Sequence, residues 1–170
     1  MSVRAAGGDY FDRARSVAIA ILVAAAAASI IGSLLDWVTI TRRPRLAPNA
    51  DFGAQQVEEP TISQPYTGIE ARDGWVVIGA AGVLVVASVG LGLRRRSFYA
   101  ALAFVAAMVI GAVAFADYRG VGDLSSSISE RMEIVGDPEP GIGIILVAVA
   151  GIAALIGAVL GLIATPSNRG

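Results

Sequence analysis

The sequence predicts an all-α membrane protein: a bundle of four transmembrane helices with two extracytoplasmic loops. Three observations support this fold class. First, 55% of the 170 residues are hydrophobic and the mean hydropathy is +0.69, which is too apolar for an ordinary soluble domain. Second, the hydrophobic residues fall into four runs of about 20 residues, the length that crosses ~30 Å of hydrocarbon. Third, three consecutive arginines, Arg94, Arg95 and Arg96, form the whole turn between the second and third runs.

The four apolar runs carry charge only at their ends, whereas each helix of a soluble bundle would show a polar face. We therefore expect every run to cross the membrane. The first run is longer than the roughly 7–15 apolar residues of a signal peptide, so that we expect an uncleaved helix there. The predicted spans are 17–37, 75–93, 97–117 and 142–164.

The triple arginine predicts the topology, because positive charge in short loops stays on the cytoplasmic side. Arg42, Arg43 and Arg45 favour the opposite orientation, but the triple arginine has no long loop to dilute it. A second role for Arg94, Arg95 and Arg96 is to bind anionic lipid headgroups. The segments outside the spans are then a cytoplasmic start (1–16), an outer loop (38–74), the cytoplasmic turn (94–96), a second outer loop (118–141) and a cytoplasmic tail (165–170).

The first outer loop begins with basic residues, becomes acidic and contains four prolines, which disfavour a long helix. Its stretches "VTIT" and "PTISQPYTGIE" are expected to form short strands, paired as a hairpin. In the second outer loop, "DLSSSISERMEIV" predicts one short amphipathic helix with Asp123 as its N-cap. Such a helix would lie on the membrane, cover the other loop or dock a partner. One side of this helix would carry Leu124, Ile128, Met132 and Val135. The following "GDPEPG" is expected to stop the helix before the fourth span.

Aspartates stand beside aromatic residues at the outer ends of three spans, in "LLDWV", "RDGWV" and "FADYR". Tryptophan and tyrosine favour the membrane interface, so that we expect these aromatic residues to be interface anchors. An alternative hypothesis is a membrane enzyme whose outer-face carboxylates converge in a pocket. The residues concerned are Asp36, Asp73 and Asp117, next to Trp37, Trp75 and Tyr118.

Cysteine, histidine and lysine are absent, which excludes disulfides, thiolate or lysine nucleophiles and the commonest metal ligand. With a net charge of −1, the chain has no basic field for nucleic acid. No ionisable residue lies inside a span, which argues against a pump or proton-coupled transporter. A small homo-oligomeric transporter or channel stays open as an alternative, although it would need a polar path. We predict no catalytic residue, no cofactor, no metal and no small-molecule substrate.

Small residues recur within the spans at the spacing of helix–helix contacts. We expect most of them to hold the bundle together. Those of the second span are spread around its circumference, which is compatible with a neighbour outside the bundle. The candidate packing or partner-interface residues are Ser29, Ser33, Gly79, Gly82, Ala103, Ala107, Gly111, Ala153, Gly157 and Gly161.

The chain resembles small Ala/Val/Gly-rich four-span proteins of actinobacteria, mycobacteria included. The resemblance is carried by the tryptophan in "LLDWV" and by the loop that closes on "YTGIEARDGW". Some proteins of this type are accessory subunits of envelope complexes. The resemblance therefore implies a non-catalytic subunit of a larger complex in the bacterial inner membrane, in a lipid bilayer with partner helices. A lipid importer of the Mce (mammalian cell entry) type is the first candidate complex, and a respiratory supercomplex is the alternative.

Overall fold

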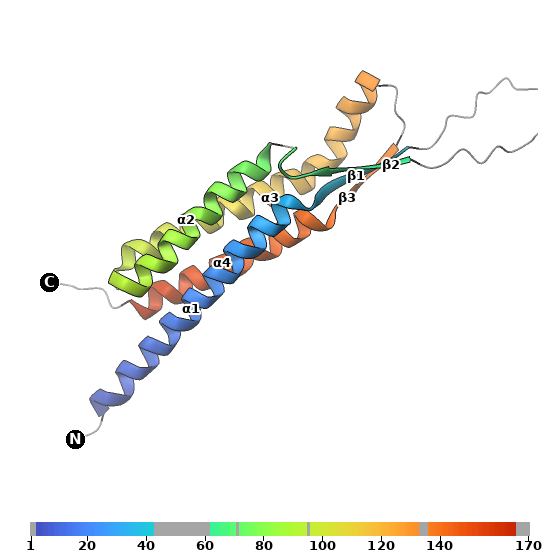
Figure 1. The fold of residues 1–170 in the computed structure, drawn as a ribbon. Helices are drawn as coiled ribbons and strands as arrows, with labels where there is room; N and C mark the ends of the chain where they lie inside the picture. The colour runs from blue at the N-terminus through green and yellow to red at the C-terminus, as the bar shows by residue number, and fades with distance from the viewer. Residues whose placement is uncertain (1–2, 43–61, 71, 95, 133–135, 166–170) are drawn as a thin grey trace, which may run out of the picture.

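A computed structural model describes residues 3–42, 62–70, 72–94, 96–132 and 136–165 of the chain (Figure 1). These residues form four helices and three strands. The helices are α1 (Val3–Leu34), α2 (Asp73–Arg94), α3 (Ser97–Met132) and α4 (Ile142–Ala164). The strands are β1 (Asp36–Arg42), β2 (Ile62–Thr67) and β3 (Gly136–Pro140).

Each helix contains a segment that is long and apolar enough to cross a membrane, which confirms a multi-pass membrane protein of the helical-bundle type. These segments are Tyr10–Leu34, Asp73–Arg94, Ser97–Gly120 and Ile142–Ala164. Helix α1 packs against α2 and α4, and α3 packs against the same two helices, so that the four form a closed ring (Figure 1). The centre of the bundle is rich in alanine, with a few larger side chains such as Leu22, Leu84 and Ile110. Small side chains allow the helix backbones to approach closely in lipid.

The three strands form an antiparallel sheet at one end of the bundle, in the order β2-β1-β3. We call this the sheet end; there α1 ends, α2 begins and α4 begins. We call the opposite end, where α2 ends at Arg94 and α3 begins at Ser97, the arginine end. The central strand β1 holds the β-branched run from Val38 to Thr41, which suits a pleated sheet.

The strand β3 replaces the loop that the sequence predicted at "GDPEPG". Pro138 lies opposite Ile40 and Pro140 lies opposite Val38 in the pairing of β3 with β1. The two prolines are two residues apart, so that their nitrogen atoms face the same, unpaired edge of the sheet and no ladder hydrogen bond is lost. The other edge strand, β2, holds Pro65. Prolines on both edges disfavour extension of the sheet by another strand.

Residues 123–132 are helical, as predicted for the second outer loop, but they form no separate helix, because α3 continues without a break from Ser97 to Met132. Asp123 accordingly lies inside α3 and is no N-cap. The chain contains no proline between residues 97 and 132, and Gly120 and Gly122 cost only about 1 kcal/mol each in a helix. The structure does not describe the side chains of the four residues that were predicted to form the apolar side of the short helix. At the other terminus, α1 begins at Val3, so that most of the predicted cytoplasmic segment 1–16 is helical.

Candidate functional site

Trp37 joins the sheet to the bundle. Its side chain is 1% exposed, and its indole Nε1 donates a hydrogen bond of 2.8 Å to the carbonyl oxygen of Gly32 in α1. Glycines make room for the indole ring. A Cβ atom on Gly143 would lie 2.8 Å from Trp37 Cδ1, and one on Gly68 would lie inside the contact distance of the ring. The prediction that Trp37 is an interface anchor is therefore wrong, because the bundle and the sheet enclose it.

Backbone hydrogen bonds fix the sheet end around this tryptophan. The amide of Gly141 donates to the carbonyl oxygen of Trp37 at 2.7 Å, and the amide of Gly74 donates to that of Gly68 at 2.9 Å. A Cβ atom on Gly74 would lie 2.6 Å from that same Gly68 oxygen. The sheet is thus attached to the starts of α2 and α4 by close backbone contacts. The sequence signal for this arrangement was the glycines that follow β2 and precede α4.

The other two predicted anchors lie on the surface. Trp75 is 62% exposed at the start of α2, and Tyr118 is 58% exposed near the end of the predicted third span. Arg119 lies over the ring of Phe115, 4.5 Å from its centroid. Their exposure is compatible with the interface role, which stays a prediction for these two residues.

The structure brings together two of the three outer-face aspartates. The side chains of Asp73 and Asp117 lie close enough for their carboxyl groups to interact electrostatically. Asp117 Oδ2 is buried and has no hydrogen-bond partner within the described residues. Asp36 is exposed. Among the described residues no group of three His, Cys, Asp or Glu side chains is arranged to hold a metal ion. The pair joins α2 to α3 without forming the predicted three-acid pocket.

Most of the small residues singled out in the sequence face the inside of the bundle. A Cβ on Gly157 would lie 3.1 Å from Ile21 and Leu22 of α1, and one on Gly161 would lie 3.3 Å from Leu91 of α2. The inward set of α1 and α3 is Ser29, Ser33, Ala103 and Ala107, each 0% exposed, whereas Ala153 of α4 is half-buried. The hydroxyl groups of Ser29 and Ser33 donate to the carbonyl oxygens of Ala25 and Ser29 in their own helix. These residues hold this bundle together.

Two close glycine contacts could not be predicted from the sequence. A Cβ on Gly32 would lie 3.0 Å from the carbonyl oxygen of Gly143, where α1 meets α4. A Cβ on Gly151 would lie 3.1 Å from the backbone nitrogen of Gly111, where α3 meets α4. Gly111 was predicted, but its partner was not, because spacing within one helix cannot show which residue of another helix lies opposite.

Gly79 and Gly82 differ from Gly32, Gly151, Gly157 and Gly161, because they point away from the bundle. Both are exposed, and no atom lies within 4 Å of a Cβ built on either. They belong to a row of exposed residues along α2 that recur at a spacing of four and three residues, a heptad-like pattern. We call this set the α2 outward face: Trp75, Gly79, Gly82, Val86, Val89 and Leu93. A glycine in a helix costs about 1 kcal/mol relative to alanine, and no contact within the described chain offsets that cost.

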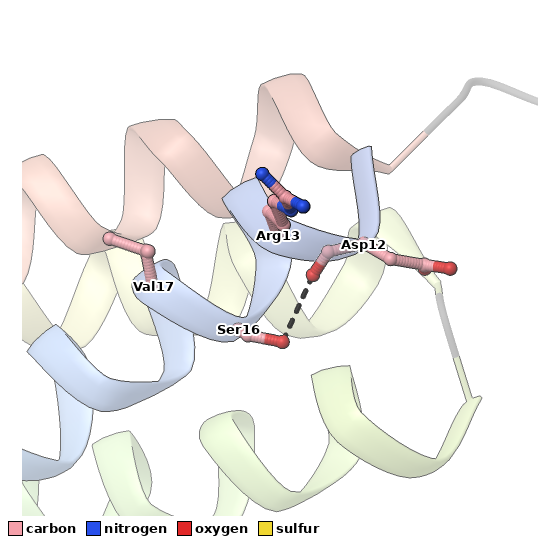
Figure 2. Close-up of a pocket in the computed structure, with 4 residues that line it drawn as sticks. All are labelled: Asp12, Arg13, Ser16 and Val17. Carbon is pink, nitrogen blue, oxygen red and sulfur yellow. Dashed lines mark hydrogen bonds between the residues drawn. The ribbon is translucent and has the colours of Figure 1, made fainter. Parts of the chain in front are cut away.

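At the arginine end, α1 carries a shallow, open groove whose described lining residues are Asp12, Arg13, Ser16 and Val17 (Figure 2). The Ser16 hydroxyl donates to the carbonyl oxygen of Asp12 at 3.0 Å. The Asp12 carboxylate lies 3.6 Å from the Arg15 guanidinium. The Arg13 side chain points away from the carboxylate of Asp12 (Figure 2), and it forms no ion pair with any residue that the structure describes.

The fold and these surfaces define a four-helix membrane protein with a small sheet at one end. Comparison with models of protein families and with curated proteins finds no match to this chain.

Proposed function

We propose that the protein is a non-catalytic accessory subunit of a larger complex in the bacterial inner membrane, and that the α2 outward face packs against a helix of a partner subunit. The open space beside Gly79 and Gly82 carries this proposal. Glycines on an outward face let a second backbone approach closely, and packing of this kind drives helix association in lipid.

The outward face of α4 provides the contrast. Every exposed position along it is a bulky aliphatic residue, which fills the surface against lipid tails and leaves no space for a close backbone. This α4 set is Ile142, Ile145, Val149, Ile152, Ile156, Val159, Leu162 and Ile163. Replacing lipid by a helix would therefore gain more packing at the α2 outward face than at α4.

The distribution of charge supports a cytoplasmic arginine end. The predicted cytoplasmic segments 1–16, 94–96 and 165–170 hold seven arginines in 25 residues, whereas the two predicted outer loops, 38–74 and 118–141, hold six in 61 residues. On the positive-inside rule we propose that both termini lie in the cytoplasm and the sheet outside. In this orientation the sheet end is available to an extracytoplasmic component of the complex. Its proline-containing edges favour contact through side chains over strand addition.

The two sequence motifs of the actinobacterial resemblance meet at one place in the structure. Trp37 belongs to "LLDWV", and Gly68, which packs against its ring, belongs to "YTGIEARDGW". Packing of the sheet end is a sufficient structural reason for both motifs. On this resemblance we propose a lipid importer of the Mce type as the complex, with a respiratory supercomplex as the alternative.

The test is affinity purification of a C-terminally tagged chain from native membranes in mild detergent, followed by mass spectrometry. The wild-type chain should retain a stoichiometric set of larger membrane subunits, and Gly82→Leu should lose them while its own thermal unfolding in detergent stays unchanged. Ala112→Leu is the matched control, because it adds the same side chain to an exposed position of α3 and should retain the partners.

Two results would contradict the proposal. Recovery of the wild-type chain alone would refute the accessory role. Co-purification of two differently tagged copies, without other subunits, would indicate the homo-oligomeric transporter or channel instead.

A further inference from the structure

We propose that the groove on α1 at the arginine end binds an anionic phospholipid, with the lipid phosphate at Arg13 and one acyl chain along the outward side of α1. This site belongs to the chain itself and does not depend on the proposed partner subunits. Its basis is that one continuous surface offers a cationic group at the membrane boundary and a shallow apolar path directly below it.

Arg13 lies at the depth of lipid headgroups. The predicted first span begins at Val17, so that Arg13 lies one helical turn before the apolar run. Tyr10 and Phe11 are 67% and 43% exposed beside it, and aromatic side chains favour this interfacial layer. The guanidinium group, which presents several donors in one plane, suits the oxygen atoms of a phosphate.

The charge around the groove favours an anionic lipid over a zwitterionic one. Asp12 also lines the groove, but its carboxylate is 3.6 Å from Arg15, which offsets its negative charge. Arg94 and Arg96 are exposed at the same end of the bundle, where α2 ends and α3 begins. A Cβ on Gly92 would lie 3.8 Å from Ile19, which places the last turn of α2 near the level of the groove.

Below Arg13, the outward side of α1 continues as small apolar residues. Val17, Ala20, Ala24 and Ala27 follow at a spacing of four and three residues, and all four are exposed. Because alanine side chains are short, this side of α1 protrudes less from its helix than the outward face of α4, which is covered by isoleucine, valine and leucine. An acyl chain that continues from a phosphate at Arg13 would therefore lie along these residues and gain contact with the helix.

The experiment is native mass spectrometry of the purified full chain in detergent, titrated with phosphatidylglycerol or phosphatidylcholine. We expect Arg13→Gln to reduce the preference for phosphatidylglycerol about fivefold, the contribution of one basic residue near an anionic surface. Arg13→Lys should retain most of the preference. The matched control Arg119→Gln, which removes an exposed arginine at the sheet end, should leave it unchanged. Ala24→Leu fills the path of the acyl chain and should weaken the binding of both lipids.

Each contrary result overturns a part of the proposal. An unchanged preference in Arg13→Gln, or an equal loss in Arg119→Gln, would show that the headgroup does not bind at Arg13. Displacement of phosphatidylglycerol by millimolar inorganic phosphate would indicate a simple anion site. Unchanged lipid binding in Ala24→Leu would show that the acyl chain lies elsewhere. Far-UV circular dichroism of each variant verifies that the helices are intact.

Discussion

Replacing Trp37 by phenylalanine tests the attachment of the sheet to the bundle. The change removes the hydrogen bond from Nε1 to the carbonyl oxygen of Gly32, which is worth about 1 kcal/mol. That oxygen also accepts from the amide of Leu35 at 3.3 Å, so that no buried acceptor loses its last partner. The smaller ring gives up buried surface worth roughly 1–2 kcal/mol more. We therefore expect Trp37→Phe to lower the free energy of unfolding by about 2–3 kcal/mol.

The assay is equilibrium unfolding in mixed detergent micelles, followed by far-UV circular dichroism. Trp75→Phe is the matched control, because Trp75 is 62% exposed, and it should change the free energy of unfolding by less than about 0.5 kcal/mol. The chain contains two tryptophans, so that each variant also leaves a single fluorophore. Acrylamide should quench Trp75 strongly and Trp37 weakly. Equal destabilisation by the two changes, or equal quenching, would refute the burial of Trp37 as the cause.

Further substitutions in the sheet end, in the helix contacts and at Asp117 probe the other contacts, all by the same unfolding assay. Gly68→Ala places a Cβ 2.7 Å from Trp37 Cζ2 and should lower the free energy of unfolding by about 1–3 kcal/mol. In the double variant, Trp37→Phe should recover part of this loss. Strict additivity of the two changes would argue against direct contact between the two residues. Gly157→Leu forces a side chain against Ile21 and Leu22 and should cost at least as much, whereas Gly82→Leu should be neutral or slightly stabilising because glycine is a poor helix former. Asp117 Oδ2 is buried without a hydrogen-bond partner among the described residues, so that Asp117→Asn, which removes the negative charge beside Asp73, should leave the stability unchanged or raise it by up to about 1 kcal/mol; a clear loss of stability would contradict this reading.

The four spans could be predicted from sequence because they depend on one physical requirement. A helix that crosses hydrocarbon must be apolar over its whole length and about 20 residues long, and this signal is local. The expected strands in the first outer loop lie at β1 and β2, since β-branched residues between turn-forming residues are also a local signal. Both inferences needed no knowledge of what packs against the segment.

The errors concern features that depend on distant parts of the chain. Trp37 in its local sequence has every mark of an interface anchor, and its burial follows from Gly68 and Gly143, which lie far from it in the chain. The strand β3 depends likewise on pairing with β1, which lies about 100 residues earlier. The continuation of α3 through Gly120 shows the opposite effect: the change in polarity at Asp117 predicts the end of a helix, although nothing in the backbone ends it there.

Small residues show why the structure changes the functional argument. The sequence spreads the small residues of the second span around its circumference and places those of the fourth span in one stripe, but it cannot show which glycines meet a neighbour within the chain. The structure separates them: Gly157 and Gly161 meet side chains of α1 and α2, whereas Gly79 and Gly82 meet nothing within 4 Å. A contact that is already satisfied inside the bundle explains a glycine by folding alone. The glycines of the α2 outward face lower the stability of their own helix, and no packing contact within the described chain compensates for this. Their position therefore favours a partner helix outside the chain as the explanation.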